Sequence, residues 1–79
     1  MDVSVFPNPF STSAAFSISN HDSKIFNFEL RDIHGNSVKN FMISSSSFEL
    51  DRGDLSSGIY FYKVMNVNST IATGKIIID

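Results

Sequence analysis

The side chains that could do chemistry in this sequence are two histidines, several aspartates and many serines. His21 and His34 are single histidines in polar stretches, and they lack the paired spacing that metal sites use. The serines include no Gly-x-Ser-x-Gly motif, and neither histidine has an evident orienting acid. No Asp-x-Asp-x-Asp run is present that would indicate a calcium loop. We therefore expect no catalytic residues, no metal site and no cofactor.

The aspartates are better explained by turns. Asp32-Ile33-His34-Gly35 has Asp first and Gly fourth, the preference of a type I turn, so we expect Asp32 to accept hydrogen bonds from its own turn. Arg52-Gly53-Asp54 spells the tripeptide that integrins bind, but Gly and Asp are common in turns for conformational reasons alone. We expect this tripeptide to form part of a connection between strands and to have no adhesive function.

Composition restricts the remaining functions. The chain has 79 residues, enough for one domain spanning 1–79, with eight Phe and two Tyr residues to fill a small core. It has no cysteine, which excludes disulfides and thiolate metal sites. The net charge is −2 and the six Lys and Arg residues are scattered, so we expect no nucleic-acid partner. A domain of this size should also lack a ligand pocket above roughly 300 Å³, so we expect no small-molecule substrate.

The apolar residues recur with a period of two, the pattern of strands with one buried face. Phe26, Phe28 and Leu30, for example, alternate with polar residues. Residues 59–64 are apolar on both faces apart from Lys63, which is typical of a central strand. The pattern predicts seven short strands, at residues 2–6, 13–19, 24–31, 37–43, 46–50, 58–66 and 70–78.

Turn residues arrive about every ten positions, as expected of two packed sheets. Residues 32–35 and 66–69 should close hairpins. In Leu55-x-x-Gly58-x-Tyr60, Leu55 should close the end of the core and Gly58 should permit an unusual backbone angle. The Tyr60 hydroxyl should then bond to nearby backbone, which makes a tyrosine corner. We predict one all-β domain, an immunoglobulin-like antiparallel β-sandwich of about seven short strands.

Two further segments lie near the ends of the chain. In Pro7-Asn8-Pro9 the prolines fix the backbone on either side of Asn8, so this segment should end the first strand in a rigid turn. Thr73-Gly74-Lys75-Ile76-Ile77 belongs to the last strand, which we expect to pair with the strand at 58–66. Gly74 should leave a gap in the side-chain row where a partner backbone could approach, and Lys75 should mark an edge, where charge discourages uncontrolled pairing.

Taken in order, these segments resemble the type A C-terminal sorting domain of the type IX secretion system of Bacteroidota, over essentially all 79 residues. The resemblance implies a non-catalytic secretion signal, joined to a larger cargo protein whose own export leader lies upstream. It implies passage through the periplasm to the cell surface or the medium. The partners would be an outer-membrane translocon and shuttle, and a sortase-like peptidase that typically removes the domain.

The resemblance also assigns roles within the motifs. Recognition of the sorting signal would involve Thr73, Gly74, Lys75, Ile76 and Ile77. The residues that shape the fold would be Pro7, Asn8, Pro9, Asp32, Gly35, Leu55, Gly58 and Tyr60. One feature departs from the family pattern, because members often finish with basic residues whereas this sequence finishes with Asp79.

Two other interpretations remain open at this point. An accessory carbohydrate-binding or adhesive module of a secreted enzyme would display a row of exposed aromatic rings. Tyr62 is the candidate whose face the sequence leaves open, since Tyr60 should be buried. A purely structural spacer would predict that export does not depend on the C-terminal residues.

Overall fold

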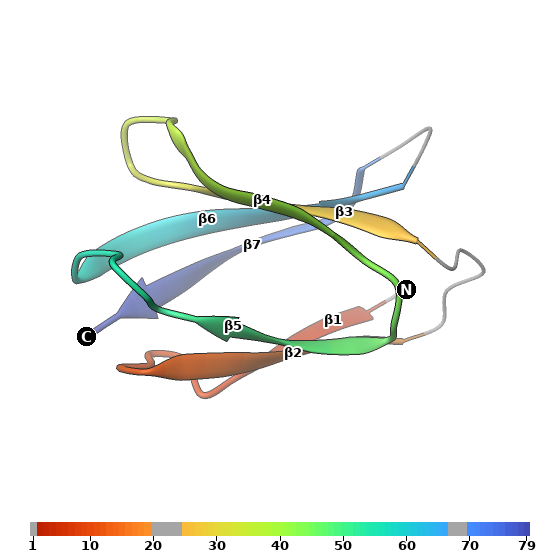
Figure 1. Ribbon diagram of the computed structural model, residues 1–79, viewed down its shortest axis with the longest axis horizontal. Helices are drawn as coiled ribbons and strands as arrows, with labels where there is room; N and C mark the ends of the chain where they lie inside the picture. The colour runs from red at the N-terminus through yellow and green to blue at the C-terminus, as the bar shows by residue number, and fades with distance from the viewer. Residues whose placement is uncertain (1, 20–24, 67–69) are drawn as a thin grey trace.

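The computed structural model describes residues 2–19, 25–66 and 70–79. The strands are β1 (Asp2–Phe6), β2 (Ser13–Ser19), β3 (Phe26–Arg31), β4 (Ser37–Ile43), β5 (Ser47–Asp51), β6 (Gly58–Met65) and β7 (Thr70–Ile78). They form two antiparallel sheets, ordered β1-β2-β5 and β4-β3-β6-β7, which pack as a sandwich (Figure 1). No helix occurs among the described residues. The predicted all-β sandwich is confirmed, and the predicted strand bounds are correct to within two residues.

The fourth strand distinguishes this sandwich from a constant-type immunoglobulin domain, where that strand joins the first sheet. Here β4 pairs with β3 along a hairpin, so the second sheet has four strands. This sheet places β6 in its interior and β7 at its edge. Two parts of the sequence prediction, His21 and positions 67–69 of the last turn, lie outside the described residues.

The core lies between the two sheets, and its centre is a cluster of aromatic rings. Phe16 of β2 stacks on Phe48 with ring centroids 4.9 Å apart, and it meets Phe28 edge-on at 5.1 Å. Tyr62 of β6 approaches Phe16 edge-on at 5.3 Å. Such ring pairs contribute about 0.5–1.5 kcal/mol each beyond the area they bury. The abundance of Phe therefore compensates for the small size of the domain.

The expected tyrosine corner is present at the start of β6. The Tyr60 ring is buried, and its hydroxyl donates a 2.7 Å hydrogen bond to the backbone oxygen of Ser56. Leu55 packs against the core as a partly buried side chain. Gly58 has a backbone φ of +149°, a value that residues other than glycine rarely adopt. Together these residues fix the path of the chain from β5 into β6.

Replacing Tyr60 by Phe should lower the free energy of unfolding by about 1 kcal/mol, the net value of one hydrogen bond. The ring stays, so packing in the core is unchanged and the measured loss reports the hydroxyl alone. Chemical denaturation of the wild type and Tyr60→Phe measures this difference. Equal stabilities would show that the corner hydrogen bond contributes nothing net.

The β3–β4 turn also forms as predicted. The Gly35 N–H donates to the Asp32 backbone oxygen at 3.1 Å, and Gly35 has a φ of +87°. The Asp32 carboxylate accepts hydrogen bonds from the backbone N–H groups of His34, at 2.9 Å, and Asn36, at 3.0 Å. The bond from Asn36, together with that from His34, lowers the pKa of the Asp32 carboxyl below its ordinary 3.8.

The lowered pKa makes the turn sensitive to acid. Because the folded-state pKa of Asp32 lies below its unfolded value, the stabilisation is complete above the unfolded pKa. It is lost as the pH falls through the folded-state pKa. A carboxyl titration by NMR should therefore give an Asp32 pKa below 3.8. A value at or above this would mean that the two backbone hydrogen bonds are not maintained in solution.

Candidate functional site

The last strand, β7, is an edge strand whose two faces have different environments. It pairs with β6 along its whole length, with Ile76 opposite Tyr60 and Lys75 opposite Phe61. Ile76 and Ile78 point into the core and are 0% and 1% exposed. Thr73 and Lys75 lie on the outer face and are exposed. The residues expected to present the signal therefore divide between the core and the surface.

The free side of β7 is occupied at its C-terminal end by residues that follow β1. The Asn8 side chain donates its amide N–H to the Lys75 oxygen at 3.1 Å and accepts a bond from the Ile77 N–H at 3.0 Å. Phe10 continues this pairing, because its N–H donates to the Ile77 oxygen at 3.0 Å. The Asp79 N–H donates to the Phe10 oxygen at 2.9 Å. We call Asn8 and Phe10 the edge clasp.

The edge clasp explains the Pro7-Asn8-Pro9 motif in physical terms. The side-chain amide of Asn8 presents an N–H donor beside a C=O acceptor, as a peptide unit does, so it can replace a neighbouring strand at this point. Both X-Pro peptide bonds around it are cis. Phe10 is buried in the core and forms a parallel bridge with Ile78. The motif near the start of the chain and the motif at its end therefore form one structural unit.

Arg52 stabilises the same corner, although no sequence pattern indicated this role. Its guanidinium group donates to the backbone oxygens of Asp79, at 2.7 Å, Ser11, at 3.3 Å, and Leu55, at 2.9 Å. It also donates to the Ser57 hydroxyl at 3.0 Å. The Arg52 guanidinium is thus bonded within the fold, as expected if Arg52-Gly53-Asp54 forms part of a connection between strands. Only the three-dimensional path of the chain brings these acceptors together.

The N-terminal part of the β7 edge remains open. Residues in an antiparallel strand direct both their N–H and C=O groups alternately to one side and the other. The N–H and C=O of Ile77 both point toward the edge clasp. Thr73 lies four residues earlier, an even number, so its N–H and C=O point to the same side of β7. Nothing in the described part of the chain pairs with the backbone groups of Thr73. The prediction that β7 is an edge strand is therefore confirmed. The edge is open near Thr73, whereas the edge clasp covers it from Lys75 onward.

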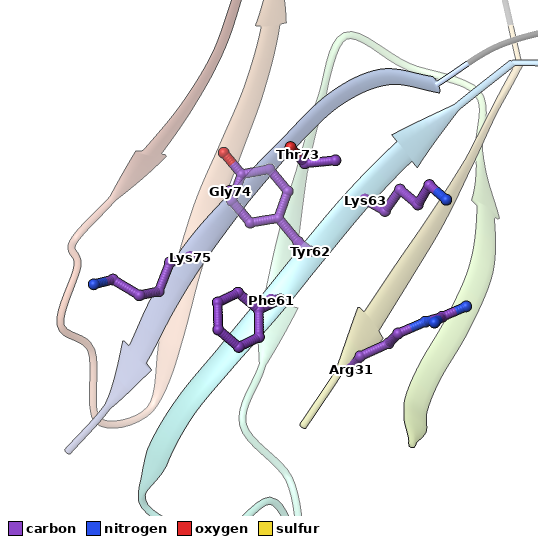
Figure 2. A pocket seen from close by; sticks show the side chains of 7 residues that line it. All are labelled: Arg31, Phe61, Tyr62, Lys63, Thr73, Gly74 and Lys75. Atoms are coloured by element: carbon purple, nitrogen blue, oxygen red, sulfur yellow. The ribbon is translucent and has the colours of Figure 1, made fainter. Parts of the chain in front are cut away.

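The expected gap at Gly74 is wrong. Gly74 lies directly opposite Tyr62, and the Tyr62 ring covers the place where a side chain at position 74 would lie (Figure 2). Tyr62 is only 8% exposed and belongs to the aromatic core. Gly74 thus makes room for a neighbour within the same sheet, a known way of stabilising glycine in β-strands. No partner backbone can enter there.

The inward position of Tyr62 also removes the aromatic platform that a carbohydrate-binding module would need. Phe6, on β1 of the other sheet, and Phe61 are the exposed aromatic rings that the structure describes. They lie on different sheets and form no row. Two open surface hollows, of about 460 Å³ beside Phe61 and 560 Å³ beside Met42, are larger than we expected for so small a domain.

The remaining motif residues shape the fold. Leu55, Gly58 and Tyr60 form the corner beside Arg52, whereas Asp32 and Gly35 belong to the separate β3–β4 hairpin. His34 is exposed in that hairpin. No cluster of three or more His, Cys, Asp or Glu side chains suited to a metal ion is found in the described segments. Within the same segments there is no helix of the length and apolarity required to cross a membrane.

Replacing Asn8 by Ala should lower the free energy of unfolding by about 1–2 kcal/mol, because it removes two hydrogen bonds to β7. The amide protons of Ile77 and Asp79 should also exchange with solvent faster. Asn40→Ala serves as the control, since it removes the same side chain from an exposed position of β4. Equal losses in the two variants would mean that the clasp does not hold the edge. Hydrogen exchange by NMR and chemical denaturation measure both effects.

Comparison with protein families identifies the chain. Residues 4–79 match the family model described as the secretion system C-terminal sorting domain. A search of curated proteins found no match. The family match covers every strand from β2 to β7 and three of the five residues of β1, and it includes the edge clasp and the tyrosine corner.

Proposed function

This chain belongs to the family of secretion system C-terminal sorting domains, and on that premise we propose that its folded surface is the signal that the type IX export machinery reads. Sorting domains of this family are in general non-catalytic. Their role implies export of a larger cargo protein across the outer membrane to the cell surface or the medium. The observation that carries our proposal is the contact of Asn8 and Phe10 with β7, because it makes the terminal strand part of a fixed fold.

The open backbone of Thr73 is the best-supported contact for the machinery. An extended segment of a partner can add to an exposed sheet edge through main-chain hydrogen bonds. The edge clasp restricts this mode to the part of β7 before Lys75. The open backbone of Thr73 and the exposed side chain of Lys75 then act directly. Ile76 holds the strand through its buried side chain, and Ile77 holds it through the bond from its N–H to Asn8. Gly74 acts by accommodating Tyr62.

We propose the remaining steps from the family role. The cargo passes through the periplasm, where a shuttle and an outer-membrane translocon engage the folded domain. A sortase-like peptidase then removes the domain at the cell surface. An accessory carbohydrate-binding role has no comparable support, because Tyr62 faces the core.

An export assay tests this function. Residues 1–79 are fused behind a periplasmically targeted fluorescent protein in a Bacteroidota host with an active type IX system. We expect the fluorescent protein at the surface or in the medium, and in the periplasm of a host without the translocon. Retention of a folded fusion in the periplasm of the active host would refute the proposal.

The edge contact is tested by Thr73→Pro in the same fusion. Proline removes the Thr73 N–H, which faces away from β6, and proline is tolerated at sheet edges for this reason. Thr73→Ala is the matched control, since it removes the side chain and keeps the N–H group. We expect export to fall with Thr73→Pro and to persist with Thr73→Ala, once NMR shows both to be folded. Equal export of the two folded variants would exclude the open edge as the contact.

A further inference from the structure

The outer face of the four-stranded sheet carries apolar side chains that the core does not require. Ile59 and Phe61 of β6 are 42% and 47% exposed, although β6 is an interior strand of its sheet. Ile77 of β7 lies directly opposite Ile59 and is half-buried. An interior strand needs two apolar faces only when both faces are covered. Nothing in the described residues covers this one, so its apolar character is unexplained by folding.

Basic residues lie on both sides of Phe61 in the sheet. In the register of the sheet, Arg31 of β3 and Lys75 of β7 are directly opposite Phe61 on its two sides. Figure 2 shows the ring between these two side chains, with Lys63 farther along β6. The hollow of about 460 Å³ is lined by the side chains of Arg31, Phe61, Lys63, Thr73 and Lys75. We call it the basic hollow.

The charge of the basic hollow opposes that of the chain. The hollow contains three of the six Lys and Arg residues of a chain whose net charge is −2. The acid on this face is Glu29, whose carboxylate bonds to the Arg31 guanidinium at 3.0 Å and leaves Lys63 and Lys75 without an ion pair among the described residues. Like charges gathered on one face repel each other, and they complement a partner surface of opposite charge.

We propose that the basic hollow binds an acidic, extended polypeptide segment of a partner protein, with carboxylates on Lys63 and Lys75 and an apolar side chain on Phe61. The apolar strip of Ile59, Phe61 and Ile77 favours a polypeptide over an acidic polysaccharide, because sugars are usually held on several aromatic rings and here there is one. The inference rests on the proposed function only in that the partner belongs to the export machinery. The binding chemistry itself is independent of that role.

Titration of the isotope-labelled chain by NMR tests the proposal. The probe is a short synthetic peptide in which Glu alternates with Leu, and the comparison peptide carries Lys in place of Glu. We expect shift changes at residues 59–63 and 73–77 with the acidic peptide alone, and weaker binding as salt is added because exposed charges are screened. Absence of these changes would overturn the proposal. Oligogalacturonate is the third probe, and binding of this sugar but not of the acidic peptide would also overturn it.

Matched variants separate a specific site from general electrostatic attraction. Lys75→Glu should weaken binding of the acidic peptide by about tenfold, equivalent to 1.4 kcal/mol. Lys39→Glu changes the net charge equally at a residue outside the hollow and should leave binding within twofold. Phe61→Ser should also weaken binding, whereas Phe6→Ser, at the exposed ring on the other sheet, should not. Equal effects within either pair would show that the hollow is not the site.

The export assay links the hollow to its biological partner. If the wild-type fusion is exported and the folded Phe61→Ser, Lys75→Glu double variant is exported equally well, the partner assignment fails while the proposed function stands. If the wild-type fusion is not exported, the proposed function fails. The peptide titration then still decides whether the hollow binds an acidic segment.

Discussion

Deletion of residues 73–79 is expected to unfold the whole domain. The deletion removes Ile76 and Ile78, which are 0% and 1% exposed. Loss of a fully buried isoleucine side chain costs about 2–5 kcal/mol. A domain of this length has a total stability on the order of 4–12 kcal/mol, so these two losses alone approach or exceed it. The deletion also leaves the edge clasp and Arg52 without the acceptors they bond on β7 and Asp79.

Thermal unfolding and a two-dimensional NMR spectrum check this expectation. The shortened chain should show no cooperative transition and narrow amide dispersion. Removal of Asp79 alone is the control, because it leaves β7 and both isoleucines in place and takes away two hydrogen bonds at the corner. This control should remain folded with a modest loss of stability. A cooperative transition in the longer deletion would mean that six strands suffice for the sandwich.

This result determines how a sorting signal can be located. A tail deletion that stops export cannot separate loss of a recognised surface from loss of the fold. Thr73 and Lys75 are exposed, so substitutions there can change what a partner meets without emptying the core. Point variants on the outer face and on the open edge are therefore the informative experiments.

The sequence was sufficient for the parts of the fold that depend on local patterns. Strand positions follow from the alternation of apolar and polar residues, since each strand has one face on the core. The tyrosine corner and the Asp32 turn were predictable because their hydrogen bonds join residues at most four positions apart. In both cases the partners are fixed by the backbone between them.

The contacts of the candidate site were harder to predict because they join distant residues. Asn8 and Lys75 are 67 positions apart in the sequence. No local pattern predicts that the Asn8 side chain will form hydrogen bonds with the backbone of an edge strand. Arg52 reaches four acceptors that only the folded path gathers. The apolar residues on both faces of β6 indicated a central strand, and β6 does lie between β3 and β7. Residues 59–64 could not show whether a second layer covers the outer face.

The role of Gly74 was also hard to predict from the sequence, because a glycine in a strand can make room either for an external backbone or for a neighbouring side chain. The choice depends on register, and the register places Tyr62 directly opposite. The Tyr62 ring cannot move away freely, since it packs edge-on against Phe16 with centroids 5.3 Å apart. A methyl group at position 74 would therefore force the ring out of its place in the core.

Gly74→Ala is accordingly expected to lower the free energy of unfolding by about 1–3 kcal/mol, the usual cost of overpacking. The sign should reverse when Tyr62 is first replaced by Ala. Without the ring, alanine at position 74 should stabilise the strand by about 0.5–1 kcal/mol relative to glycine, which loses more backbone entropy on folding. Chemical denaturation of the four chains in this double-mutant cycle gives the coupling between the two positions directly.

Tyr62→Phe provides the finer control in this cycle. The site of the added methyl group lies against ring carbons as well as the hydroxyl of Tyr62, so removal of the hydroxyl should relieve only part of the cost. If Tyr62→Phe removed the whole cost of Gly74→Ala, the steric clash would involve only the Tyr62 hydroxyl. A cost of Gly74→Ala that is the same with and without the Tyr62 ring would show that Gly74 serves another purpose, such as the close approach of a partner. The cycle thus decides whether this glycine belongs to the fold or to recognition.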